Sequence, residues 1–283
     1  MKVVACCVRP EAYQLIRTWA GDRGHELALV VTSPGPDQDR ADDYRGIIAA
    51  APPMQDIFVT TNMARLADAI RPLSADLLVT CTFPYRIPEQ ARALPRLGAF
   101  NLHPTPLPYY RGPNPSRMIY DGFPTVGACF HRMVHEFDAG PVLSRHESSL
   151  PDALTPITVW EAWQSTIIAA FYEGMAKAME GDTGQPQRPA EQTRAARFSE
   201  TERRLDWTLP GRSVLLRWIG LELFGPGAIA SVGGDTYRVL QVDFRTATSN
   251  LPPPGTIASQ SATGAEIAVH DGFVSMVLGE LPK

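Results

Sequence analysis

The densest group of residues that could do chemistry lies between Asn101 and Gly112, in the run NLHPTPLPYYRG. Asn101 and His103 are two residues apart, and on a strand this spacing directs both side chains to one side. Three prolines then stiffen the chain as it leaves the strand. An amide and an imidazole on one face can both donate hydrogen bonds to an oxygen that gains negative charge during a reaction. Without further residues, the pair is also consistent with a structural role, in which His103 only forms hydrogen bonds that stabilise the end of the strand.

A carboxylate that could assist this pair lies about 35 residues further on, at Asp138 in the run EFDAGPVL. Such a carboxylate would orient His103 and stabilise its protonated form, so that the ring can donate at neutral pH. It could also relay the proton that an attacking amine loses. Taken alone, Asp138 before Ala-Gly is equally typical of a turn.

The elements that must position these residues alternate between strand and helix. We expect strands at 2–8, 26–32, 56–61 and 76–81, with amphipathic helices at 11–23 and from residue 63 onward. This order predicts a parallel sheet with right-handed crossovers, whose sites lie beyond the carboxyl ends of the strands. The candidate site loops are therefore 82–88, 101–111 and the acidic stretch 33–43. The last of these fits a solvated surface loop equally well.

The second half of the chain changes character after residue 180. Before it we expect a strand at 98–102, a short helix at 113–120, strands at 125–133 and 142–146, and a helix at 158–180. Residues 181–199 lose periodicity and collect Gly, Pro, Gln and Thr, which is typical of a linker or an extended surface strap. We place a catalytic domain at 1–183, a linker at 184–200 and a β-rich domain at 201–283.

The expected C-terminal domain begins with one amphipathic helix at 210–224. Short β-structure follows at 227–232, 237–244, 256–258, 267–270 and 273–277. Asp271-Gly272 between the last two strands is a strong hairpin signal.

Taken in order, these motifs resemble the signature of the folate-dependent formyltransferases. In that family a strand ends in Asn-x-His, runs into Leu-Pro-x-x-Arg-Gly and is followed by an Asp-x-Gly loop, as in 101–103, 107–112 and 138–140 here. The run FPYRIP at 83–88 occupies the position of the family's pterin-binding loop. RLDW at 204–207 resembles the start of the C-terminal barrel of methionyl-tRNA formyltransferase and its relatives. The resemblance covers nearly the whole chain.

The resemblance implies a fold and a reaction. The fold is α/β, a Rossmann-like, mostly parallel sheet with helices on both faces, followed by a small β-rich, OB-like C-terminal barrel. The reaction moves the formyl group of 10-formyltetrahydrofolate to an amine through a tetrahedral carbon with a developing oxyanion. Asn101 and His103 would stabilise that oxyanion and Asp138 would serve His103. This chemistry needs no metal.

The resemblance also implies two sets of binding residues. Backbone groups and apolar walls for the pterin would come from Phe83, Tyr85, Arg86, Ile87, Pro88, Leu107, Val134, Glu136 and Phe137. Ordinary packing at a strand end is the other interpretation of Phe83 and Tyr85. Contacts to the acceptor would come from Arg9, Tyr109, Tyr110, Arg111 and Asn114. Arg111 fits equally well as a brace of its loop. No Gly-rich turn follows the first strand, which argues against a dinucleotide.

Charge bears on which amine is formylated. The chain has a net charge of −4, and its 26 basic residues form no run. Segment 33–62 holds five Asp and two Arg, and 201–283 holds seven basic and eight acidic side chains. Proteins that grip nucleic acid concentrate positive charge. We therefore expect a small-molecule amine, an amino sugar or an amino acid or hydroxyornithine-like amine of specialised metabolism, rather than methionyl-tRNA, which is the alternative.

Two other functions compete with formyl transfer. Hydrolysis of the formyl-folate is one, but deformylases of this kind carry an N-terminal regulatory domain, for which a first strand at residue 2 leaves no room. A folate-binding module without turnover is another, against which the intact Asn101, His103 and Asp138 argue. The four cysteines show no metal-site spacing and are expected as buried thiols. With no signal peptide or long apolar stretch, we expect a cytoplasmic protein without a membrane anchor, and a homodimer on base rates alone.

Overall fold

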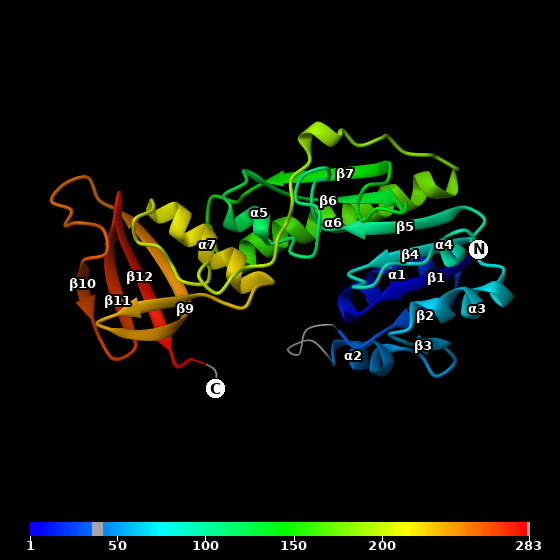
Figure 1. Ribbon diagram of the computed structural model, residues 1–283, viewed down its shortest axis with the longest axis horizontal. Coiled ribbons are helices and arrows are strands. Elements are labelled where there is room, and N and C mark those ends of the chain that lie inside the picture. Colours follow the sequence, from blue (N-terminus) through cyan, green and yellow to red (C-terminus); the bar gives the residue numbers. More distant parts are fainter. Residues whose placement is uncertain (36–41, 282–283) are drawn as a thin grey trace. The chain divides into compact units, whose positions relative to one another are not determined.

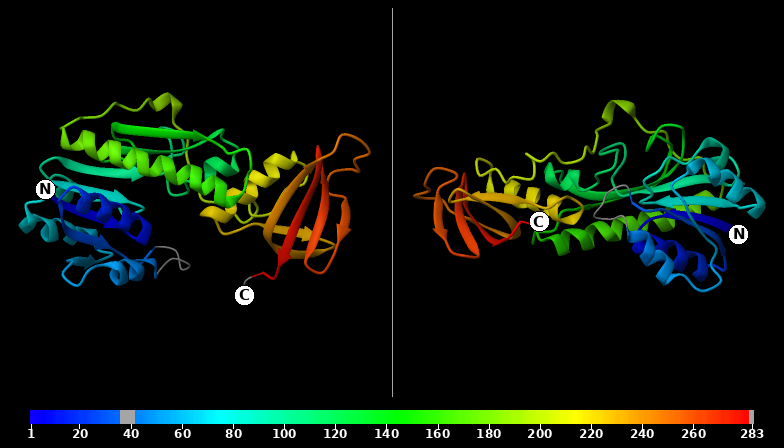
Figure 2. Two further views of the ribbon diagram at one scale, coloured as in Figure 1. Left: turned by 180° about the vertical axis from the view of Figure 1, so that it is seen from behind. Right: turned by 60° about the horizontal axis from the view of Figure 1, so that its bottom comes forward.

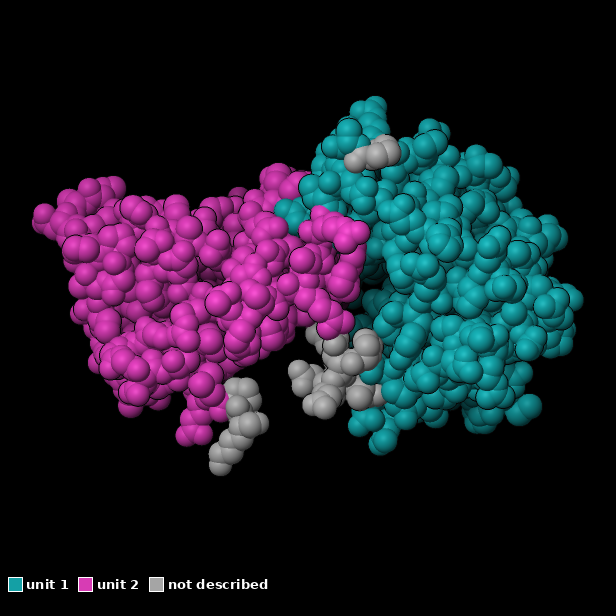
Figure 3. Space-filling view, viewed as in Figure 1, with its two compact units in different colours: residues 1–111, 127–147, 164–193 teal, residues 112–126, 148–163, 194–283 magenta. Residues whose placement is uncertain are grey.

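The computed structural model describes residues 1–35 and 42–281 (Figure 1). Its chain divides into two compact units, each assembled from several segments (Figure 3). The first comprises 1–111, 127–147 and 164–193, and the second 112–126, 148–163 and 194–283. Because the units interleave along the chain, the predicted domain boundaries at 184 and 201 stay a prediction.

A seven-stranded sheet forms the first half of the fold. Its strands are β1 (Lys2–Cys7), β2 (Glu26–Thr32), β3 (Ile57–Val59), β4 (Leu77–Cys81), β5 (Gly98–His103), β6 (Thr125–Arg132) and β7 (Val142–Ser149), in the order β3-β2-β1-β4-β5-β6-β7. Strands β1 to β5 pair in parallel, and β6 runs antiparallel to β5. The central strands β1 and β4 are buried along nearly their whole length because helices cover both faces.

Two hydrophobic clusters show which helices cover which face. On one face α1 (Pro10–Asp22) and α6 (Pro156–Met179) bury Trp19 and Phe171 against the sheet. On the other face α3 (Leu66–Ile70) and α4 (Glu89–Arg92) bury Leu66 and Ala91. α6 approaches β6 so closely that a Cβ at Gly174 would lie 2.3 Å from Phe130. The predicted Rossmann-like sheet with helices on both faces is confirmed.

The remaining elements differ in length from the sequence expectations. Helix α2 (Asp43–Ala50) is not among the expected elements, and α5 is only Arg117–Tyr120, so the helix expected from 113 starts later. β7 runs three residues further than expected, to Ser149. β3 is shorter than expected, because its residues are half-buried or exposed at the sheet edge. Most of the acidic stretch 33–43 lies outside the described residues.

The C-terminal part follows α7 (Gly211–Leu223) and contains a curled, five-stranded antiparallel sheet (Figure 2). Its strands are β8 (Ile229–Val232), β9 (Asp235–Thr246), β10 (Ile257–Gln260), β11 (Gly264–Val269) and β12 (Gly272–Gly279), in the order β10-β11-β12-β9-β8. The predicted hairpin joins β11 to β12 across His270 and Asp271. The predicted small β-rich domain is confirmed.

The cysteine prediction is also confirmed. Cys6, Cys7, Cys81 and Cys129 are free and buried, and burial raises the pKa of the Cys81 and Cys129 thiols to about 12. Such thiols are inert. None of the helices in the described part of the chain is long and apolar enough to cross a membrane.

Candidate functional site

Asn101 is held in one orientation by the two strands beside β5. The Thr80 hydroxyl of β4 donates a 2.6 Å hydrogen bond to Asn101 Oδ1. On the other side Asn101 Nδ2 lies 3.1 Å from Nε2 of His131, which is its direct partner on β6. Because an amide nitrogen carries two hydrogens, one can bond His131 while the other serves a substrate oxygen.

His131 is the neutral member of the cluster. Its Nδ1 lies 3.1 Å from the Arg132 carbonyl, so the hydrogen-bond network assigns the proton to Nδ1 and leaves Nε2 to accept from Asn101. The side chain is 2% exposed, and this burial lowers the pKa of His131 to about 4 despite the nearby Asp138. A neutral ring with fixed tautomer can therefore orient the Asn101 amide at neutral pH.

Asp138 lies between the two histidines. One carboxylate oxygen is 3.6 Å from His103 Nδ1 and 3.8 Å from His131 Nε2. The aspartate has a left-handed backbone, with φ at 54°, which is uncommon for a residue with a side chain. His103 Nε2 faces the Tyr110 carbonyl at 3.5 Å. Both nitrogens of His103 thus face oxygens that accept hydrogen bonds, at distances that are long for such bonds.

The structure therefore brings the three predicted catalytic residues into one cluster, joined through a residue that sequence reasoning missed. Asp138 reaches His103 and His131, and His131 reaches Asn101. The cluster lies at the carboxyl end of β5, where a parallel sheet places its site. The signal that could have found His131 is its place seven residues before Asp138, on a strand that pairs with Asn101.

The loop after His103 is tied to a distant segment of the same unit. The Tyr110 N–H donates to Thr193 Oγ1 at 2.8 Å, and the Arg111 N–H donates to the Thr193 carbonyl at 3.0 Å. The Arg111 side chain is 9% exposed; it donates to Gln187 Oε1 at 2.9 Å and lies 3.5 Å from Glu136. These contacts support the interpretation of Arg111 as a brace. The Tyr109 ring lies under the Arg145 guanidinium, 5.5 Å away.

The two predicted folate loops meet. The Arg86 guanidinium lies 4.9 Å from the centre of the Phe137 ring, which joins 83–88 to 134–138. Ile87 and Leu107 are buried, and Phe83 packs against the core, with its ring 5.9 Å from that of Tyr85. Val134, Glu136 and Phe137 keep exposed side chains, and Pro88 caps α4.

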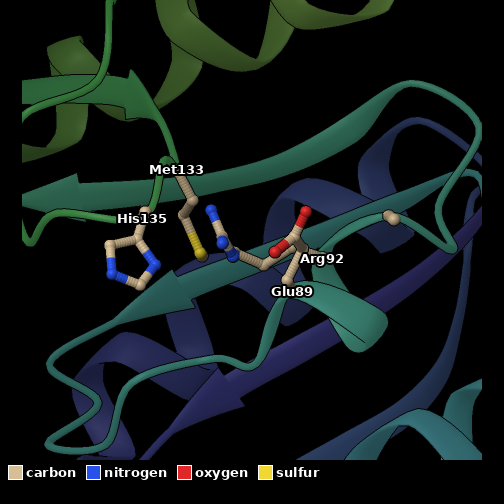
Figure 4. A pocket seen from close by; sticks show the side chains of 5 residues that line it. Glu89, Arg92, Met133 and His135 are labelled. Atoms are coloured by element: carbon tan, nitrogen blue, oxygen red, sulfur yellow. The ribbon is translucent and has the colours of Figure 1, made fainter.

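An open surface hollow of about 330 Å³ is lined by residues that are close in sequence to these two loops. Met133 and His135 from the segment after β6, and Glu89, Arg92 and Ala93 from α4 and the residue that follows it, line it (Figure 4). This volume is typical of small-molecule sites. Its acid, guanidinium and imidazole can bond the edge of a flat heterocycle such as a pterin, and Met133 and Ala93 supply apolar contact. The lining thus offers groups of the kind that a pterin edge bonds, although sequence reasoning named only the neighbours of these five residues.

Two further residues, Asn114 and Arg9, were predicted to contact the acceptor. Asn114 belongs to the second unit, where its amide donates to the Ala196 carbonyl and accepts from the Ser116 hydroxyl. Arg9 directly precedes α1. Their acceptor contacts stay predictions. Among the described residues, no group of three or more His, Cys, Asp or Glu could hold a metal ion.

An Asn-His-Asp cluster at the carboxyl end of a mostly parallel sheet, followed by a β-rich domain, fits a group-transfer enzyme that stabilises a developing oxyanion. The family model described as "Formyl transferase" matches residues 17–164, and "Formyl transferase, C-terminal domain" matches 197–282. The chain belongs to the formyltransferase family. It is a formyltransferase that uses 10-formyltetrahydrofolate as its formyl donor, as the resemblance implied.

Two relatives by sequence are methionyl-tRNA formyltransferases. A methionyl-tRNA formyltransferase from Thiobacillus denitrificans is 29% identical over 268 residues, which cover 91% of this chain and 84% of that protein. One from Jannaschia sp. is 28% identical, covering 86% of this chain and 76% of that protein.

Two solved structures with the same fold have other names. The sugar 3N-formyltransferase WlaRD, solved with dTDP and 5-N-formyl-THF, has a TM-score of 0.70 at 12% identity and covers 100% of this chain and 99% of that one. HypX from Aquifex aeolicus in complex with tetrahydrofolic acid has a TM-score of 0.66 at 18% identity. This chain is covered to 98%, but it spans only 43% of the HypX chain. At these identities the likeness shows the fold alone.

Proposed function

We propose that this formyltransferase acts on the amine of a small molecule, with Asn101, His103 and Asp138 as its catalytic residues. The observation that carries the site is the cluster at the end of β5, where His131 fixes Asn101 and Asp138 lies 3.6 Å from His103. The folate supplies an activated formyl carbon when bound. The amine nitrogen bonds to that carbon, and the bond from the carbon to the folate nitrogen breaks.

The chain's own residues would manage charge and protons in this reaction. Asn101 Nδ2 and the His103 ring donate to the oxyanion that develops at the tetrahedral stage. Asp138 accepts the proton that the amine loses, directly or through His103, and that proton finally goes to the folate nitrogen. The distance of 3.6 Å between Asp138 and His103 is of the kind expected before substrate draws such groups together.

Charge supports a small acceptor. A tRNA acceptor stem needs cationic side chains to replace its counterions, yet 33–62 carries a net charge of −3 and 201–283 one of −1. Three of the cationic groups of the catalytic region are already engaged. Arg111 contacts Gln187 and Glu136, Arg86 lies over Phe137, and Arg145 is paired with Glu147.

Methionyl-tRNA is the second candidate, and the comparison with relatives favours it. The methionyl-tRNA formyltransferase of T. denitrificans matches across both the catalytic and C-terminal regions. A chain that keeps both parts of such a relative can keep its acceptor. We rank it second because the charge argument concerns this chain's own residues.

One assay with different acceptors distinguishes these candidate functions. Purified protein is mixed with 10-formyltetrahydrofolate and, in separate reactions, sugar-nucleotide amines, amino acids with hydroxyornithine, or methionyl-tRNA, and folate release and product mass are followed. We expect release coupled to one formylated small amine. Formylated methionyl-tRNA would overturn the charge argument, and release without any acceptor modified would indicate a hydrolase. Absence of release with every acceptor would favour a folate-binding module.

A further inference from the structure

The segment 185–193, which we name the strap, contains a glutamine whose whole amide is engaged. Gln187 Nε2 donates to the Asp138 carbonyl and to the Gly140 carbonyl, both at 2.8 Å. Its Oε1 accepts from Arg111 Nη2 at 2.9 Å. An amide has two N–H donors and one carbonyl, so these three bonds fix its orientation. The strap was expected only as a linker or surface segment.

The two carbonyls that Gln187 holds belong to the turn that aims the Asp138 carboxylate. Asp138 has its φ at 54°, a conformation that persists only where surrounding contacts impose it. Gly140 packs so tightly that a Cβ there would lie 1.7 Å from the Arg132 carbonyl oxygen. The turn is thus confined by Arg132 on one side and bonded by Gln187 through its carbonyls. Loss of those bonds would free the peptide after Asp138 to rotate and move the carboxylate.

The third bond joins this turn to the loop that follows His103. Arg111 belongs to that loop, and the strap also bonds the loop through Thr193, which accepts from the Tyr110 and Arg111 N–H groups. Tyr110 in turn presents the carbonyl that His103 Nε2 faces. Gln187 therefore links the two segments that face His103. One carries the Tyr110 carbonyl, which faces Nε2, and the other carries the Asp138 carboxylate, which faces Nδ1.

We propose that Gln187 is a positioning residue for formyl transfer, which acts by holding the Asp138 turn so that its carboxylate reaches His103. This inference rests on the catalytic role proposed above for Asp138. It assigns to the strap a part in the reaction. Gln187 does not itself touch the reacting atoms.

Two substitutions distinguish the role of the Gln187 amide nitrogen, which bonds the Asp138 turn, from that of its oxygen, which bonds Arg111. Gln187→Ala removes all three bonds, whereas Gln187→Glu keeps an acceptor for Arg111 but turns carboxylate oxygens toward the two carbonyls. If Gln187 acts through the Asp138 turn, both variants lose about 10- to 100-fold in kcat, with the KM for 10-formyltetrahydrofolate within about twofold. Near-normal turnover in Gln187→Glu would assign the role to the Arg111 link and overturn the proposal.

The control is another glutamine of the strap. Gln192 makes no side-chain hydrogen bond within the described part of the chain. Gln192→Ala should keep kcat and the melting temperature of the wild type. If Gln192→Ala loses as much kcat as Gln187→Ala, then any change in the strap lowers turnover. That result would contradict a specific role of Gln187.

Coupling to Asp138 is tested by the double variant. If Gln187 acts only by positioning that carboxylate, then Gln187→Ala costs nothing further in an Asp138→Asn background. Full additivity of the two losses in kcat would mean that Gln187 acts elsewhere, or only through stability.

A readout without turnover keeps this inference apart from the proposed function. Hydrogen–deuterium exchange of the amides in 136–142 should be at least tenfold faster in Gln187→Ala and unchanged in Gln192→Ala. Unchanged exchange in Gln187→Ala overturns the positioning role. Faster exchange in a protein that transfers no formyl group under any condition would instead place the failure with the proposed function.

Discussion

Two carboxylates of this enzyme, Asp138 in the first unit and Glu202 in the second, have opposite surroundings. Glu202 is 2.5 Å from Arg117 and accepts from both the backbone and the hydroxyl of Ser199 at 2.8 Å. These bonds, that of Arg117 first, lower the pKa of Glu202 to about 2. Asp138 instead lies 3.6 and 3.8 Å from two histidine nitrogens, and it occupies a left-handed turn.

The difference supports the proposal that Asp138 serves the reaction, whereas Glu202 holds the fold. Glu202 is bonded at short distance to groups of its own unit, and Arg117 adds ring contacts with Tyr120 and Phe198. Asp138 faces His103 at a distance that a substrate-driven shift can close. We expect changes near Asp138 to act on turnover and changes near Glu202 to act on stability.

The largest expected effect is on turnover. His103→Ala removes the ring that faces Asp138 and should lower kcat by about 10³-fold, which corresponds to about 4 kcal/mol of transition-state stabilisation. Folate binding and the melting temperature should stay nearly unchanged. Initial rates, equilibrium binding of the folate and thermal unfolding check this, and a variant that keeps a tenth of the wild-type kcat would falsify the assigned role.

The next effect tests the neutral His131 through pH. Its pKa in the folded protein is about 4, below the ordinary value of 6.5, so the unfolded chain binds more protons between these values. The free energy of unfolding should therefore fall as the pH drops from 7 toward 4, by about 2 kcal/mol from this residue alone. His131→Gln should lack this part. Urea unfolding of both proteins at pH 7, 5.5 and 4.5 measures the difference, and parallel pH dependences would show that His131 titrates normally.

Periodicity and local motifs were sufficient to predict much of the fold. The apolar runs that became β1, β2 and β4 are continuous because both faces are covered, and Asp271-Gly272 marked a hairpin. The bounds of short elements were predicted less well, because a few residues show little periodicity. β3 is only Ile57–Val59, and α5 begins at Arg117, after a Pro-rich segment. Local patterns do not determine where a short edge element starts.

Only those residues of the proposed site that belong to sequence motifs could be predicted. Asn101, His103 and Asp138 stand in recognisable runs, whereas His131 gains its role from pairing with Asn101 across two antiparallel strands. Gln187 lies 49 residues from Asp138 in a segment without periodicity, and only the folded chain brings its amide to that turn. Contacts of this kind depend on tertiary structure, which no local pattern encodes.

A smaller effect is expected at Glu202, and it concerns stability. Glu202→Ala leaves Arg117, whose side chain is 18% exposed, without its shortest partner. We expect a loss of about 1.5 kcal/mol in the free energy of unfolding at pH 7, because both ions are partly exposed and the full cost of a buried unpaired charge does not apply. The kcat per folded molecule should be unchanged. A tenfold lower kcat at normal stability would break the division drawn between the two carboxylates.

The smallest expected effect is at Asp121, a second carboxylate that pairs with the same arginine as Glu202. Asp121 also pairs with Arg117, at 3.2 Å, yet burial raises its pKa while Arg117 only partly opposes this. A carboxyl group whose pKa is higher in the folded than in the unfolded protein costs stability once it ionises, as the pH rises above its ordinary value of 3.8. Asp121→Asn removes that cost together with an ion pair whose aspartate is 36% exposed and therefore screened.

The two contributions oppose each other, so Asp121→Asn should change the free energy of unfolding at pH 7 by less than about 0.5 kcal/mol. Glu202→Ala in the same titration series provides the contrast, since both carboxylates share one arginine. A loss at Asp121 as large as that at Glu202 would mean that proximity to Arg117 alone decides the stability. A difference between the two would show that the hydrogen bonds from Ser199 make Glu202 the structural anchor.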